Sequence, residues 1–203
     1  MVVRRESTSG APVVPALFHD VVDALALARL RPEVLCEAMP APQRIAPHAT
    51  ALSADVTLAD VDVATGRLIV LHDPAGNDAW NGTFRCVSYV RAEIELDMAA
   101  DPMLGQVAWS WLLDALEGDA DATALSGTVT RVATESFGSM AEDEGTAQIE
   151  IRASWTPTVA AGADIVPHVE AWGELLCTAA GLEPVPEGVA VMPSRRGQRG
   201  ATR

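Results

Sequence analysis

The sequence contains no lysine, and all 14 basic residues are arginine. Cysteine is scarce: Cys36, Cys86 and Cys177 are an odd number of thiols at distant positions. This pattern argues against a disulfide framework and a Cys-x-x-Cys metal knuckle, and it predicts buried thiols in a reducing cytoplasm. No apolar run approaches the roughly 20 residues that span a bilayer. The first residues lack the apolar stretch of a secretory signal, so we expect a cytoplasmic protein without a membrane segment.

Catalytic and cofactor motifs are also missing. The chain has no P-loop, dinucleotide-binding fingerprint, zinc-finger spacing or Gly-x-Ser-x-Gly pattern around a serine. The sequence therefore predicts no cofactor and no metal, and it favours a non-catalytic protein over an enzyme.

Charge is unevenly distributed along the 203 residues, whose net charge is −14. We expect residues 1–14 to be a flexible lead-in, residues 15–183 one domain, and residues 184–203 a disordered tail with four arginines. Between residue 6 and the arginine-containing end at 194–203, eight arginines stand against 27 acidic residues, a balance of −19. A body this acidic repels phosphate backbones, so direct nucleic-acid binding by the folded part is not expected.

Apolar periodicity and turn residues divide the chain into helices and strands. Helices are predicted at residues 15–30, 101–117 and 164–180, and strands at residues 33–39, 50–58, 66–71, 83–96, 127–135 and 147–155. The order α-β-β-β-β-α-β-β-α lacks the strand–helix–strand alternation of a parallel nucleotide-binding sheet. We therefore expect an α+β fold in which a single antiparallel sheet of five to six strands carries helices mainly on one face.

A loop predicted at residues 72–82 (HDPAGNDAWNG) holds the strongest candidate site. His72, Asp73 and Asp78 could supply a base or ligand atoms, and Trp80 a stacking surface. Arg44 and His48 lie on a proline-rich bend that could fold over this loop and bind a carboxylate or phosphate. The open alternative is a structural turn in which Asp73 bonds backbone amides and Trp80 packs on the sheet.

Two further sets of side chains are candidates for binding. Four arginines lie on predicted strands: Arg85, Arg91, Arg131 and Arg152. They would form a cationic stripe if they shared one face of the sheet. Strand glutamates could instead balance them through pairs between neighbouring strands. The predicted middle helix has a wide apolar arc, so Trp109 and Trp111 are candidates for the core or for a homodimer interface.

Several long segments of the chain are distinctive, among them RPEVLCEAMPAPQRIAPHATALSADV, GRLIVLHDPAGNDAW, FRCVSYVRAEIELDMAADP and AWGELLCTAAGL. With these segments the chain resembles, over residues 18–192, an uncharacterised actinobacterial family catalogued as domain of unknown function number three thousand. The resemblance implies no assigned activity; a ribonuclease-D-like gene beside the family's genes implies at most a tie to RNA metabolism. The element order is also similar to the fold of type III secretion chaperones.

Three functions remain open at this point. A non-catalytic protein-interaction or dimerisation module fits the wide apolar arc and the missing catalytic residues best. A small-ligand binder or enzyme with its site at loop 72–82 is the first alternative, and an accessory to RNA processing is the second.

Overall fold

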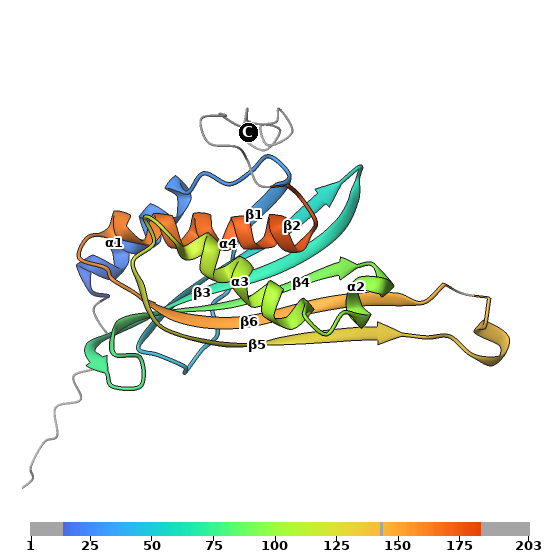
Figure 1. The fold of residues 1–203 in the computed structure, drawn as a ribbon. Helices are drawn as coiled ribbons and strands as arrows, with labels where there is room; N and C mark the ends of the chain where they lie inside the picture. Colours follow the sequence, from blue (N-terminus) through green and yellow to red (C-terminus); the bar gives the residue numbers. More distant parts are fainter. Residues whose placement is uncertain (1–13, 143, 184–203) are drawn as a thin grey trace, which may run out of the picture.

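A single six-stranded antiparallel sheet forms the framework of the computed structural model, which describes residues 14–142 and 144–183 (Figure 1). Most of the expected lead-in and the whole expected tail lie outside these residues. The strand order is β1-β2-β3-β4-β6-β5, so β1 and β5 are the two edges. The strands are β1 (Val34–Met39), β2 (His48–Leu58), β3 (Val61–Asn77), β4 (Gly82–Ile94), β5 (Ala122–Thr134) and β6 (Thr146–Pro157).

The helices cover one face of this sheet (Figure 1). They are α1 (Ala16–Ala24), α2 (Leu96–Ala100), α3 (Leu104–Leu116) and α4 (Val166–Ala179), with short 3-10 turns at Leu25–Leu27, Gly138–Met140 and Gly162–Ile165. Helix α4 packs across β2, β3 and β4, and α3 packs on β5 and α4. The α+β class, the single antiparallel sheet and the element order are thus confirmed.

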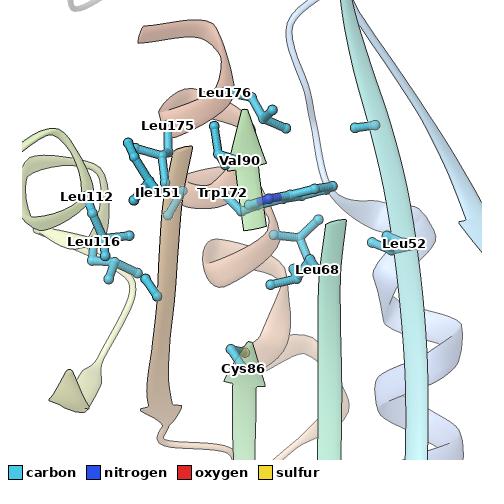
Figure 2. Packing of buried hydrophobic residues seen from close by; sticks show 14 of the residues in the cluster. Leu52, Leu68, Cys86, Val90, Leu112, Leu116, Ile151, Trp172, Leu175 and Leu176 are labelled. Atoms are coloured by element: carbon cyan, nitrogen blue, oxygen red, sulfur yellow. The ribbon is translucent and has the colours of Figure 1, made fainter. Parts of the chain in front are cut away.

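The core lies between the sheet and its helices, where alternate strand residues meet the apolar sides of α3 and α4. Trp172 of α4 lies over the middle strands, close to Leu68 and Val90 (Figure 2). Gly66 permits this packing, because a Cβ there would lie 2.8 Å from the Leu176 side chain and 3.1 Å from Trp172. The period of two along each strand sends the intervening residues to the other face, which no helix covers.

The predicted loop 72–82 is the main correction. Residues 72–77 continue β3, and the turn between β3 and β4 is confined to residues 78–81. Pro74 and Gly76 are accommodated by a register shift between His72 and Asn77, because an irregularity lets a strand carry residues that break a regular ladder.

Other boundaries also differ from expectation. The first helix ends at Ala24 and continues only as a 3-10 turn, so it is shorter than the predicted 15–30. The short helix α2 begins at Leu96, the last residue of a predicted strand, and fills the segment left between that strand and the helix predicted from residue 101. Strand β5 begins at Ala122, five residues before the strand predicted at 127–135, and its pairing with β6 includes a register shift between Thr123 and Ser126.

Candidate sheet-face groove

The uncovered sheet face carries a polar, arginine-rich groove, whose side chains follow directly from strand register. One row across β3, β4, β6 and β5 reads Ile69–Val87–Ser154–Ser126, the next reads Arg67–Tyr89–Arg152–Thr128, and the third reads Thr65–Arg91–Glu150–Thr130. Because side chains alternate along each strand, all of these positions share one face. A groove of about 770 Å³ lies along them, lined by residues of the first two rows together with Thr65 and Arg91.

Positive charge dominates this groove although the protein as a whole is acidic. Its three rows hold three arginines and one glutamate, whereas the chain has a net charge of −14. Arg67 is exposed and has no hydrogen-bond or ion-pair partner within the described part of the chain. Arg91 is held through its Nε, which donates to Oε1 of Gln148 at 2.9 Å. The groove therefore offers at least one uncompensated cation to a ligand.

Tyr89, Glu150 and Arg152 form a fixed cluster in the middle of the face. The Tyr89 hydroxyl donates to Oε1 of Glu150 at 3.0 Å, and Arg152 Nη1 lies 2.7 Å from the other carboxylate oxygen. The Arg152 guanidinium also lies over the Tyr89 ring, 5.1 Å from its centroid. The hydrogen bond from Tyr89, followed by the contacts with Arg152, holds the pKa of Glu150 below its usual range. Glu150 is therefore ionised at neutral pH and offsets Arg152 in particular.

Arg85 is a buried cation next to the groove, and its hydrogen bonds go to neutral acceptors. Its Nη1 donates to the Ala124 carbonyl at 2.9 Å and to Thr156 Oγ1 at 3.0 Å. Its Nη2 donates to Oγ of Ser126 at 3.2 Å and of Ser154 at 2.6 Å. Burial lowers the pKa of the guanidinium, but an arginine starts so high that it stays protonated.

The two serines connect Arg85 to the groove. Ser126 and Ser154 both line it, and their hydroxyl oxygens lie 3.2 Å apart. Because each serine oxygen accepts a hydrogen bond from Arg85, the serine hydrogens are left to bond the neighbouring serine oxygen or a group in the groove. This end of the groove is therefore a donor site backed by a buried positive charge, suited to a carboxylate or carbonyl oxygen.

The structure brings His48 and His72 together, as partners in register on β2 and β3. Both lie on the helix-covered face, where the His72 ring stacks between Phe18 and Phe84, with centroids 5.7 and 4.1 Å away. His72 Nδ1 donates to the Thr83 carbonyl at 3.0 Å, and burial lowers the pKa of the ring. His72 is thus a neutral, buried imidazole in an aromatic stack.

The aromatic stack does not include the other candidates of the predicted loop and bend. The Asp73 carboxylate accepts the Ala75 amide at 3.1 Å, and Asp78 is exposed on the turn. Trp80 is half-buried, and its carbonyl accepts a hydrogen bond from the Thr156 hydroxyl. Arg44 is exposed, with a positive φ of 69°. A catalytic or ligand role for these residues stays a prediction.

The helix tryptophans and Arg131 contact the core side. Trp109 and Trp111 are half-buried against the core, and Trp109 lies over Gly127 of β5, where a Cβ would come within 2.6 Å of its ring. Arg131 lies on the helix-covered face and donates to the carbonyls of Ala99 and Asp101. Three of the four strand arginines, Arg85, Arg91 and Arg152, therefore share one face, and Arg67 joins them there in place of Arg131. The alternative of balancing by strand glutamates holds for Arg152, which pairs with Glu150.

Sequence reasoning overlooked the residues that complete this groove, namely Arg67, Tyr89, Ser126 and Ser154. The signal was available in part, because Arg67, Tyr89 and Arg91 alternate with apolar residues on their strands. The pairing of β4 with β6, which places Tyr89 beside Arg152, depends on a crossover that local pattern does not reveal.

Comparison with known proteins identifies a family for the chain but no activity. A family model described as protein of unknown function (DUF3000) matches residues 14–190. No curated protein and no solved structure matches the chain. Among the described residues, no helix is long and apolar enough to cross a membrane.

Proposed function

Since the chain belongs to DUF3000, a family of proteins of unknown function, we propose a function from its geometry: it is a non-catalytic interaction module whose sheet-face groove binds an acidic segment of a polypeptide. The observation that carries the proposal is the cationic groove in an acidic protein, with Arg67 unpaired at its rim. An acidic segment gains charge complementarity there and is repelled elsewhere on the body, which fixes where it docks.

The lining of the groove suits a peptide better than a nucleic acid. Ile69 and Val87 provide an apolar floor beside the cations, which fits alternate side chains of an extended peptide. The one aromatic ring in the three rows, Tyr89, already has Arg152 stacked on it. A nucleobase therefore lacks a free stacking platform, and a long polyanion also meets the acidic body.

We also propose that this activity is cytoplasmic. All three cysteines are free, and burial raises the pKa of the Cys177 thiol to about 12. Free thiols are typical of proteins in a reducing compartment, which supports this location.

Fluorescence anisotropy of labelled decapeptides tests the proposal. A peptide that alternates glutamate and leucine should bind, and the lysine–leucine counterpart should not. The double substitution Arg67→Glu with Arg91→Glu should weaken binding by up to about thirtyfold, since each rim charge contributes up to about 1 kcal/mol.

A matched control has the same change of net charge outside the groove. Arg29→Glu with Arg44→Glu alters two exposed arginines that do not line it, and we expect the affinity to stay within about twofold. Equal weakening by both double variants, or tighter binding of a labelled single-stranded RNA decamer than of the acidic peptide, would overturn the proposal.

A further inference from the structure

We infer that the acidic segment bound by the groove is the tip of the β5–β6 hairpin of a second copy of this chain, so that the protein is a reciprocal homodimer. The inference rests on the proposed function, for which it names the partner. The hairpin extends well beyond the body that the helices cover (Figure 1). Its tip combines exposed apolar side chains with exposed acids: Phe137, Met140, Glu142 and Glu144.

The tip is chemically complementary to the groove. Phe137 is 77% and Met140 58% exposed, which is unusual for side chains of their size and typical of interaction surfaces. Glu135, Glu142 and Glu144 around them are also exposed. The groove has an apolar floor at Ile69 and Val87 and a cationic rim, so apolar and charged groups of the two surfaces can be matched together.

The hairpin cannot place this tip in its own groove. Thr128 lines the groove, and β5 continues for six more residues to Thr134 before the tip begins. At about 3.3 Å per residue, the tip starts roughly 20 Å away along a paired, extended ribbon. A paired hairpin does not fold back on its own base without losing its ladder, so the contact must be made with another chain.

A twofold axis allows both chains to make this contact at the same time. If two uncovered faces meet in opposite directions, each tip reaches the partner's groove, and the axis passes between groove and tip near Thr130 and Val132. Val132 is 38% exposed on this face. The interface is then isologous and closed, with two identical contacts per dimer.

Sedimentation equilibrium with charge-reversed full-length chains tests this arrangement. The unaltered chain should sediment at twice its 21.3 kDa. The tip variant Glu142→Arg with Glu144→Arg places like charges on tip and groove, so it should be monomeric. The groove variant Arg67→Glu with Arg91→Glu makes both surfaces acidic and should also be monomeric, whereas the control Arg29→Glu with Arg44→Glu should stay dimeric.

An equimolar mixture of the tip and groove variants gives the decisive measurement. Each basic surface then faces an acidic one on the other chain, so heterodimers should form although neither variant dimerises alone. A monomeric unaltered chain, a tip variant that stays dimeric, or a mixture of folded variants that stays monomeric overturns the inference. The tip substitutions lie on exposed residues, so the tip variant decides the matter even if the groove variant fails to fold.

The peptide experiment separates this inference from the proposed function. With the tip variant as host, no competing tip occupies the groove, and the glutamate–leucine peptide should bind. Peptide binding to a chain that never dimerises would leave the proposed function standing and refute the partner. A chain that neither dimerises nor binds the peptide would refute both.

Discussion

The buried pair Trp155–His168 predicts a specific loss of stability in mild acid. His168 is 1% exposed, and its Nδ1 accepts a hydrogen bond from Trp155 Nε1 at 3.1 Å. Burial lowers the pKa of His168 to about 4, and the carboxylates of Asp121 and Asp164 offset this only in part. Protonation would also put a proton on the nitrogen that accepts from Trp155, so the buried ring resists it.

The sign and size of the effect follow from linkage. Between the unfolded pKa of about 6.5 and the folded pKa of about 4, the unfolded chain binds more protons, so the free energy of unfolding falls as pH falls. From pH 7 to pH 4.5 this one histidine should remove about 2 to 3 kcal/mol. Below the folded pKa the loss levels off.

Urea unfolding followed by tryptophan fluorescence at several pH values measures this contribution. His168→Gln keeps an acceptor for Trp155 but does not titrate, so its stability should fall less between pH 7 and pH 4.5, by about 2 to 3 kcal/mol. His19→Gln, at an exposed histidine, is the control and should follow the unaltered chain. If the His168→Gln and unaltered curves run parallel within about 0.5 kcal/mol, the reasoning is wrong.

Two further predictions concern packing and the buried cation. Gly66→Ala should lower the free energy of unfolding by about 1 to 3 kcal/mol, because the new Cβ meets Leu176 and Trp172. Gly105→Ala in α3 is the control: its Cβ meets no atom within 4 Å, so it should be neutral or stabilising. Equal effects of the two substitutions in thermal unfolding would contradict this. Arg85→Met should lower stability by about 2 kcal/mol, since it leaves Thr156, Ser126 and Ser154 without their donor. Arg67→Met on the same face should change stability by less than about 0.5 kcal/mol, and a urea midpoint that moves equally in both variants would refute the role given to Arg85.

The fold class was largely predictable because its signals are local. Alternation predicted the body of β2, β4, β5 and β6. The Asp101-Pro102 pair predicted a helix in the right place, although α3 begins three residues later, at Leu104, and the Asp101 carboxylate accepts the Met103 amide just before it at 2.8 Å. The end of the last helix was equally local: Gly181 follows α4 with a φ of 80°. These are short-range preferences of the backbone and its side chains.

The loop at residues 72–82 shows where local signals fail. Pro74, Gly76 and Asn77 are turn residues by preference, yet β3 continues through them because Asn77 still pairs with Gly82 on β4. Pairing with a neighbouring strand outweighs a weak local preference. The same pairing placed His72 beneath Phe18 instead of on a solvent-exposed loop.

The sequence by itself determined the class of the fold, its element order and the acidic balance of the body, because periodicity, breakers and charge are properties of neighbouring residues. Only the tertiary structure decided which arginines share a face. The crossover that pairs β4 with β6 places Tyr89 beside Arg152, and it lets Arg85 reach Ser126 and Ser154 on two other strands. Strand order arises from contacts between distant segments, so a groove built on it cannot be read from any local pattern.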